Sequence, residues 1–193
     1  MIRIAEEQDV PEILSIYAPY ILETTHTFEY DVPAVEEFLE RFRSITARFP
    51  WLVWEEDGRI LGYAYGSAPF ERAAFQWSCE TSVYLQPEAQ GRGIGRSLYT
   101  AMEKFLTILG YRRNYAIITS ENLPSLAFHE KLGYTNAGKF TGCAFKFGKR
   151  LGIVWMEKEI KKSEIPCEFP DTWPFIRQDA QKFSNILDIL SLF

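Results

Sequence analysis

A glycine-rich segment has the residue types and the spacing of a site that binds an anion. It lies between an expected strand at 77–85 and an expected helix to about Leu109, and reads Gln86-Pro87-Glu88-Ala89-Gln90-Gly91-Arg92-Gly93-Ile94-Gly95-Arg96. The backbone N–H groups of such a turn face outward at the positive end of the helix dipole, and Arg92 and Arg96 add positive charge. We therefore predict that residues 90–96 hold a phosphate or a similar group.

Two familiar nucleotide-binding motifs do not fit this turn. The dinucleotide motif G-x-G-x-x-G would need a glycine where Arg96 stands, and the Walker motif would need Gly-Lys-Ser/Thr, which the turn lacks. What remains is the pattern Q-x-x-G-x-G at 90–95. Taken alone, three glycines before a helix are equally well explained by a tight turn.

A second segment with chemically useful side chains lies at 122–134 and reads N-L-P-S-L-A-F-H-E-K-L-G-Y. We expect a helix at 124–132, on which Ser125 and His129 share one face because they are four residues apart. Gly133 is suited to end that helix, since glycine readily adopts the left-handed conformation of a C-cap. The segment therefore brings a hydroxyl and an imidazole side by side.

The two segments together resemble the Gcn5-related N-acetyltransferase (GNAT) family, whose shared ligand is acetyl-CoA. In that family Q-x-x-G-x-G binds the pyrophosphate, and the next motif is N-x-x-S-x-x-x-aromatic-x-x-x-G-Phe/Tyr, which residues 122–134 match. The separation of the two motifs and their flanking elements are also similar to the family. The resemblance extends over about residues 2–159.

Five shorter segments resemble one branch of that family, the phosphinothricin acetyltransferases. They are T-T-H-T-F-E at 24–29, P-W-L-V at 50–53, E-T-S-V-Y at 80–84, L-A-F-H-E-K-L-G-Y at 126–134 and F-K-F-G at 145–148. Enzymes of this branch acetylate the α-amino group of small amino-acid-like substrates such as phosphinothricin, methionine sulfoximine or methionine sulfone. The resemblance therefore implies the same class of reaction here.

The resemblance also implies that acetyl-CoA is the co-substrate and indicates which residues contact it. The turn would anchor the pyrophosphate, the backbone of the strand before it would face the pantetheine arm, and two residues of the second motif would lie near that arm. These residues are Val83, Tyr84, Leu85, Gln90, Gly91, Arg92, Gly93, Ile94, Gly95, Arg96, Asn122 and Ser125. The alternatives are a helix N-cap for Asn122 and an ordinary first-turn serine for Ser125.

Glu80 and His129 are the candidate catalytic residues. Acetyl transfer from a thioester to an amine needs a deprotonated amine and a proton for the departing thiolate. Glu80 stands among Cys79, Thr81 and Val83 in a strand suited to burial, which raises the pKa of a carboxyl, and the resemblance makes it the general base, acting through water. His129 takes the position of a tyrosine proposed as general acid in many relatives, and imidazole titrates near neutral pH. The alternatives are an arginine partner or solvent for Glu80, and packing or a cofactor contact for His129.

Phe28, Glu29, Arg72 and Phe75 are the candidate substrate-binding residues, because the resemblance puts residues 28–29 and the loop at 69–75 on the substrate side. Arg72 is suited to the carboxylate of an amino acid, since the planar guanidinium fork matches that anion. The alternative is an arginine that is only solvated in its loop. The substrate side is the part of the site that the residues specify least.

Two residues and the tail depart from the branch. His26 stands where relatives tend to have a small residue, and Gly152 stands where many relatives have aspartate. The segment 161–193 extends past the usual end of the branch. The first two departures leave the identity of the substrate open, and the third leaves the assembly open.

The elements that must position these residues follow an order that predicts an α/β protein. We expect strands at 2–5, 51–55, 60–67, 77–85, 115–119, 134–140 and 144–158, and helices from 9 to about 21, at 36–48, from about 95 to 109 and at 124–132. Asp9 should cap the first helix and Pro19 should bend or end it, while Asp57-Gly58 predicts a tight turn. Hairpins precede βα units, so we predict a three-layer α-β-α GNAT fold around a central mixed, mostly antiparallel sheet.

Length and composition indicate one globular domain: the chain has 193 residues, 47% hydrophobic and 24% charged. We assign 1–160 to the acetyltransferase domain and 161–193 to a C-terminal extension of unknown role, with a possible short helix near 186–190. The net charge of −5 argues against nucleic acid or an anionic membrane as a partner. The N-terminus does not resemble a signal peptide, and Cys79, Cys143 and Cys167 fit neither a disulfide framework nor a zinc site. We expect a cytoplasmic protein without a metal.

The expected function is an N-acetyltransferase that moves acetyl from acetyl-CoA to the α-amino group of a small amino-acid-like substrate, as a homodimer. One alternative is an acetyltransferase of the same fold that acts on a protein N-terminus, a lysine or an antibiotic amine. Another is a module that binds acyl-CoA without turnover, although the presence of both Glu80 and His129 argues against it. A purely structural α/β domain would leave the paired motifs as coincidence.

Overall fold

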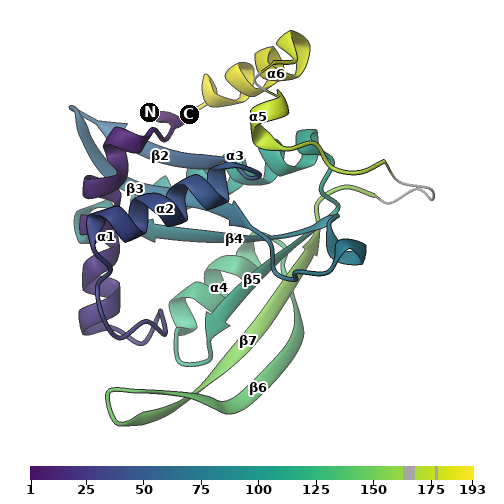
Figure 1. Ribbon diagram of the computed structural model, residues 1–193. Helices are drawn as coiled ribbons and strands as arrows, with labels where there is room; N and C mark the ends of the chain where they lie inside the picture. The colour runs from purple at the N-terminus through teal and green to yellow at the C-terminus, as the bar shows by residue number, and fades with distance from the viewer. Residues whose placement is uncertain (163–167, 177) are drawn as a thin grey trace.

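The computed structural model describes residues 1–162, 168–176 and 178–193 and contains one seven-stranded sheet, in the order β1-β2-β3-β4-β5-β7-β6 (Figure 1). The strands are β1 (Ile2–Ile4), β2 (Trp51–Glu56), β3 (Arg59–Ser67), β4 (Ser78–Leu85), β5 (Arg113–Thr119), β6 (Thr135–Lys146) and β7 (Lys149–Glu159). All neighbouring strands are antiparallel except β4 and β5, which are parallel. The predicted mixed, mostly antiparallel sheet is confirmed.

Helices cover both faces of the sheet, as the three-layer prediction requires. On one face α1 (Val10–Glu23) and α2 (Val35–Thr46) pack on the aromatic side chains of β2 and β3. On the other face lie α3 (Ile94–Leu109) and α4 (Leu123–Lys131), in separate apolar clusters. The helical spacing of apolar residues in α3 explains its position, because every residue of that stripe is buried: Leu98, Met102, Phe105, Leu106 and Leu109.

The sheet opens between its two parallel strands. β4 and β5 pair only from Ser78 to Glu80 and from Arg113 to Tyr115, whereas β4 stays paired with β3 from Glu80 to Leu85, and β5 with β7 along its whole length. Beyond Glu80 a pocket lies between the diverging strands, lined by residues 81–84 of β4 and 116–119 of β5. β4 runs along this opening and ends at Leu85, directly before the glycine turn.

The first helix does not end at Pro19, and its N-terminus differs from the prediction. It continues through Pro19 to Glu23, and the buried Ile21 and the packing of the Tyr20 ring on Tyr84 (5.1 Å between centroids) offset the hydrogen bond that proline cannot donate. Asp9 precedes α1, but its side chain does not cap that helix. It accepts hydrogen bonds instead from the Glu6 N–H (2.7 Å) and from the Arg3 guanidinium.

The last hairpin also differs from the prediction, in which one strand ended at 140 and the next began at 144. β6 continues to Lys146, because Gly142 (φ 63°) forms a bulge in the strand and the turn falls on Phe147 and Gly148 (φ 50° and 70°). Gly152 of β7 lies beside this bulge, where a Cβ would come within 2.6 Å of the Phe140 carbonyl oxygen. An aspartate at position 152 would therefore require the bulge to move.

The described part of the C-terminal segment packs on α3. It contains α5 (Trp173–Ile176) and α6 (Ala180–Leu190), so the short helix expected near 186–190 is part of a longer one. The Trp173 ring stacks on Phe105, and the Asp171 N–H donates to the Leu109 carbonyl oxygen (2.8 Å). Ile176 and Ile186 are buried in the same cluster as α3, so the tail contributes to the main core.

Three further features concern the described residues only. Cys79 and Cys143 are free thiols, and Cys167 lies outside the described residues. In 1–162, 168–176 and 178–193 no helix combines the length and the apolar character needed to cross a membrane. The same ranges contain no group of three or more His, Cys, Asp or Glu side chains arranged to hold a metal ion.

Candidate active site

The glycine turn presents a row of unpaired N–H groups. Gly91 and Gly93 have φ angles of 73° and 83°, a conformation that glycine adopts without steric cost, and Gly93 is the N-cap of α3. The Gln90 N–H bonds to Pro87 and the Ser97 N–H to Gly93, but the N–H groups of 91–96 form no hydrogen bond with a described residue. A Cβ at Gly91 or Gly93 would have no atom within 4 Å. The turn is therefore open to an anion.

The side chains around the turn divide into exposed and buried ones. Gln90, Arg92 and Arg96 are exposed, and Arg92 forms an ion pair with Glu56 (2.7 Å) that solvent weakens on both sides. Ile94 and Gly95 are buried, and a Cβ at Gly95 would come within 3.2 Å of the Leu85 side chain. These two residues can offer only their backbone to a ligand, whereas the arginines can offer charge.

Only alternate peptide groups of the strand β4 face the pocket. The Gln86 N–H bonds to the Leu61 carbonyl oxygen of β3, so by alternation the peptide groups of Tyr84 face β3, and those of Val83 and Leu85 face the opening. The Tyr20 hydroxyl donates to the Leu85 carbonyl oxygen (2.8 Å). Of the three residues predicted to contact pantetheine, Val83 is thus the one whose peptide groups face the opening without such a partner.

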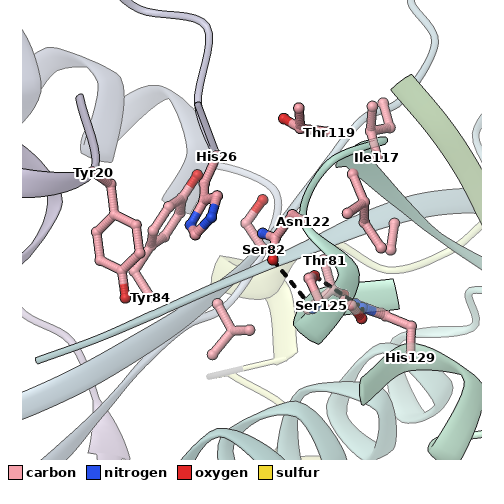
Figure 2. A pocket seen from close by; sticks show the side chains of 13 residues that line it. Tyr20, His26, Thr81, Ser82, Tyr84, Ile117, Thr119, Asn122, Ser125 and His129 are labelled. Atoms are coloured by element: carbon pink, nitrogen blue, oxygen red, sulfur yellow. Dashed lines mark hydrogen bonds between the residues drawn. The ribbon is translucent and has the colours of Figure 1, made fainter. Parts of the chain in front are cut away.

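Asn122 and Ser125 enter the same pocket from the start of α4 (Figure 2). The Asn122 Oδ1 accepts a hydrogen bond from the Ser125 N–H (3.2 Å), which is the N-cap interaction considered as the alternative. The cap uses only the oxygen of the amide, so the Asn122 NH₂ group stays available to a ligand. A structural and a binding role are compatible at this residue.

Glu80 carries a carboxylate without a partner. It shares one face of β4 with Ser82 and Tyr84, whose ring packs on Tyr17 of α1 (4.9 Å between centroids), so the carboxylate faces the α1 side of the sheet. Among the described residues none donates a hydrogen bond to the Glu80 carboxylate or forms an ion pair with it. Burial raises the pKa of the carboxyl to about 7. A group of this kind can take a proton from an ammonium at neutral pH.

His129 is buried and engaged at both ring nitrogens. Nδ1 lies 2.7 Å from the Ser125 carbonyl oxygen, and Nε2 lies 3.1 Å from the Tyr99 hydroxyl, which is 3.3 Å from the Thr81 carbonyl oxygen. Burial lowers the pKa of the imidazole. A neutral ring that donates from Nδ1 to the Ser125 carbonyl oxygen has Nε2 as an acceptor, so Nε2 and the Thr81 carbonyl oxygen compete for the single proton of the Tyr99 hydroxyl. Tyr99 was not predicted, because an aromatic residue on an apolar helix face is typical of a core.

A polar cluster lies on the side of the sheet that Glu80 faces. Glu29 forms an ion pair with Arg41 (2.7 Å) and accepts a hydrogen bond from the Tyr17 hydroxyl (2.8 Å). Burial opposes ionisation of Glu29, but these two donors outweigh it and lower the pKa of the carboxyl. Burial raises the pKa of Tyr65, and the charges of Glu80, Arg41 and Glu29 all act on its hydroxyl. The charges of Glu80 and of this cluster therefore act on the same hydroxyl, that of Tyr65. Arg41 belongs to the cluster but was not predicted from the sequence.

Arg72 and Phe75 lie together in a separate hollow with Phe70. The Phe70 ring packs edge-on against Tyr115 (5.9 Å), and Tyr115 is the register partner of Glu80 on β5, so the two share one face of the sheet. Arg72 is exposed, and its guanidinium has no hydrogen-bond partner among the described residues. The hollow therefore borders the Glu80 end of the opening, not the pocket that His129 lines. Phe28 is partly buried beside Glu29.

The comparison with protein families identifies the fold and its chemistry. The model of the GNAT acetyltransferase domain matches residues 2–155, most of the chain. The chain belongs to the GNAT acetyltransferase family. Its glycine turn and the opening between β4 and β5 are thus features of an acetyltransferase, and the predicted family and fold are confirmed.

The relatives of this GNAT chain indicate which branch of the family it is similar to. The chain is 33% identical over 165 residues to a phosphinothricin N-acetyltransferase of Alcaligenes faecalis, covering 84% of each protein. It is 28% identical to an L-methionine sulfoximine/L-methionine sulfone acetyltransferase of Salmonella typhimurium, covering 86% of this chain and 97% of the relative. The solved structure of a phosphinothricin acetyltransferase from Sinorhizobium meliloti in complex with acetyl-CoA is similar with a TM-score of 0.81 and 33% identity, covering 86% and 94% of the two chains. The predicted resemblance to this branch is confirmed.

Proposed function

We propose that this acetyltransferase moves acetyl from acetyl-CoA to the α-amino group of a small amino-acid-like substrate, of the phosphinothricin, methionine sulfoximine or methionine sulfone kind. The observation that carries the proposal is the opening between β4 and β5. The pairing of the two strands ends at Glu80, whose carboxylate has no partner among the described residues, and β4 continues along the opening into the turn with the unpaired N–H groups of residues 91–96. The names of the relatives supply the substrate class.

The residues that would hold the co-substrate fit its chemistry. The turn at 90–96 would bind the pyrophosphate through backbone N–H groups, with Arg92 and Arg96 beside it. The Val83 peptide and the Asn122 amide would hydrogen-bond the amides of the pantetheine arm. Acetyl-CoA, when bound, supplies a thioester whose carbonyl carbon the amine attacks. Holding the two reactants in place can itself lower the activation free energy by several kcal/mol.

Glu80 and His129 would each serve one of the two proton transfers of the reaction. Glu80 would accept a proton from the substrate ammonium, directly or through a water, which a carboxylate with a pKa of about 7 can do at neutral pH. His129 would relay the proton that the thiolate takes: the neutral ring would first accept a proton and then give one up, with Tyr99 holding the ring in place through Nε2. The N–C bond forms and the C–S bond breaks, so one proton leaves the amine and one reaches sulfur.

The substrate would lie on the face that Glu80 shares with the Glu29 cluster. Arg72 would bind the carboxylate of the amino acid, and Phe28, Glu29 and Phe75 would border its side chain. The proximity of loop 68–76 to the Glu80 end of the opening supports this arrangement. The predicted homodimer and the cytoplasmic location stay predictions.

An amine screen with acetyl-CoA tests the proposal. The release of free thiol is measured with methionine sulfone, methionine sulfoximine, phosphinothricin, their amides and a basic peptide. The proposal expects turnover with at least one free amino acid and much less with its amide. Turnover with the peptide, or equal turnover of acid and amide, would instead support an enzyme for protein or antibiotic amines. Binding of acetyl-CoA without turnover of any amine would support a non-catalytic acyl-CoA module.

A further inference from the structure

Both histidines of the chain line the same pocket. The sequence contains only His26 and His129, and they reach the opening between β4 and β5 from opposite walls (Figure 2). His129 comes from α4, whereas His26 comes from the irregular segment at 24–34 between α1 and α2. Figure 2 shows the His26 ring turned toward Ser82 and Asn122 across the pocket.

The backbone around His26 is held on both sides. The Thr119 hydroxyl of β5 donates to the Thr25 carbonyl oxygen (2.6 Å), and the Lys146 ammonium of β6 donates to the Thr27 carbonyl oxygen (2.8 Å). The Thr27 hydroxyl is hydrogen-bonded to the Tyr17 hydroxyl (2.7 Å). Three elements thus fix the segment, so the place of the His26 ring is determined by the fold.

The two imidazoles differ in their availability. Both nitrogens of His129 are engaged, by Ser125 and by Tyr99. The His26 ring, by contrast, forms no hydrogen bond with any residue that the structure describes, and its nearest ring is that of Tyr20 at 6.1 Å. His26 is also exposed to solvent while it lines the pocket. It is therefore the imidazole that can exchange protons both with the pocket and with bulk water.

We propose that His26 is a second proton acceptor of the acetyl-transfer site, which carries the proton of the substrate ammonium to solvent. The inference rests on the proposed function, because it needs an amine at the opening. A lone pair on the neutral ring takes one proton from the ammonium, the freed amine forms the N–C bond, and the imidazolium then releases that proton to water. No group other than the amine, the thioester and water is required.

The groups around His26 favour its neutral form. Although one side of the ring is exposed, partial desolvation at the pocket wall and then the positive charge of Lys146 on β6 lower the pKa of the imidazole. The other polar side chains that line the pocket are Tyr20 from α1, Thr81, Ser82 and Tyr84 from β4, Thr119 from β5, and Asn122, Ser125 and the neutral His129 from α4 and its start. None of these carries a charge at neutral pH, and Glu29 lies in the same segment but is paired with Arg41. His26 is therefore ready to accept a proton.

Nuclear magnetic resonance tests the placement without any turnover. Two histidines give two sets of imidazole C–H signals, which the variants His26→Gln and His129→Gln assign. Acetyl-CoA should shift both signals, because both rings line the pocket. A shift of His129 alone would overturn the placement of His26 beside the reacting groups. If neither signal shifts and no acetyl-CoA binds, the proposed function itself fails, which is a different outcome.

Kinetics tests the proton transfer, with the amino acid that the wild type acetylates best. His26→Gln should lower kcat about tenfold at pH 7. This loss is smaller than that expected for a sole general base, because Glu80 can still accept a proton. The KM for acetyl-CoA should not change, and added imidazole should restore part of the rate. Leu22→Ala, an exposed residue at the end of α1, is the control and should keep the wild-type rate. A variant that changes only the KM of the amine, or that imidazole does not rescue, would contradict the proposal.

Discussion

Glu80 gives the sharpest test of the site, because one substitution should change activity and stability in opposite directions. Glu80→Gln keeps the size of the side chain and removes the proton acceptor. The wild-type kcat/KM should rise with pH through about 7, the pKa of the buried carboxyl. The variant should lose about 10²–10⁴-fold in kcat/KM, the usual contribution of a general base, and should lack that rise.

The stability change follows from the same pKa. Burial raises the pKa of Glu80 from 4.5 to about 7. Each tenfold change in acidity is worth about 1.4 kcal/mol, so ionising this group in the folded protein costs at most about 3 kcal/mol. The folded protein binds the proton more tightly than the unfolded chain, so the free energy of unfolding falls as pH rises from about 4.5 to about 7. Glutamine has no such penalty, so Glu80→Gln should be more stable than the wild type at pH 8 and similar to it at pH 4.

The assay combines kcat/KM from pH 5 to 9 with urea unfolding at pH 4 and pH 8. Glu36→Gln, in the exposed first turn of α2, is the matched control and should change neither quantity. A Glu80→Gln protein with a near-wild-type rate at pH 7 would mean that another group or water takes the proton. A variant with the same pH dependence of stability as the wild type would mean that Glu80 is not desolvated in the folded protein.

Three further predictions test other parts of the molecule. Gly93→Val forces a β-branched residue into a φ of 83° and puts a side chain where the anion would lie, so calorimetry should show at least a tenfold loss of acetyl-CoA affinity in a folded protein. Unchanged affinity would refute the assignment of the turn. Arg72→Ala should raise the KM of a free amino acid and leave that of its amide unchanged, because the guanidinium would bind the carboxylate equally in the ground state and in the transition state. Equal effects on both would argue against carboxylate binding. Trp173→Ala should lower the free energy of unfolding by about 3 kcal/mol, as burial in the core predicts, and a change below about 1 kcal/mol would mean that the tail adds little to that core.

Features that depend on near neighbours in the chain could be predicted from the sequence. Asp57 and Gly58 have the positive φ angles (52° and 73°) that the Asp-Gly turn required, and Gly133 has the left-handed conformation (φ 88°) expected at the end of α4. The cap of α4 by Asn122 was also foreseen as an alternative. Short-range sterics and hydrogen bonds decide such features, so a few adjacent residue types specify them.

Local signals were insufficient where distant contacts compete with them. Pro19 should have bent or ended α1, but packing of Tyr20 and Ile21 on the sheet carries the helix past it. Gly142 resembles a turn residue, but pairing with β7 makes it a bulge. At Pro19 the burial of apolar side chains on the sheet outweighs a local preference of a few kcal/mol, and at Gly142 the hydrogen bonds to a neighbouring strand do so.

The sequence by itself determined the family, the glycine turn and the identity of Glu80 and His129 as candidates, because their types and spacing recur in motifs. It did not determine that Glu80 would lack a partner, that Tyr99 would engage His129, or that His26 would face His129 across one pocket. Those relations depend on where β4 and β5 separate and on how residues 24–34 cross the opening. Only the tertiary structure decides them, since the free energy of ionising or hydrogen-bonding a side chain depends on neighbours that the chain brings together from distant positions.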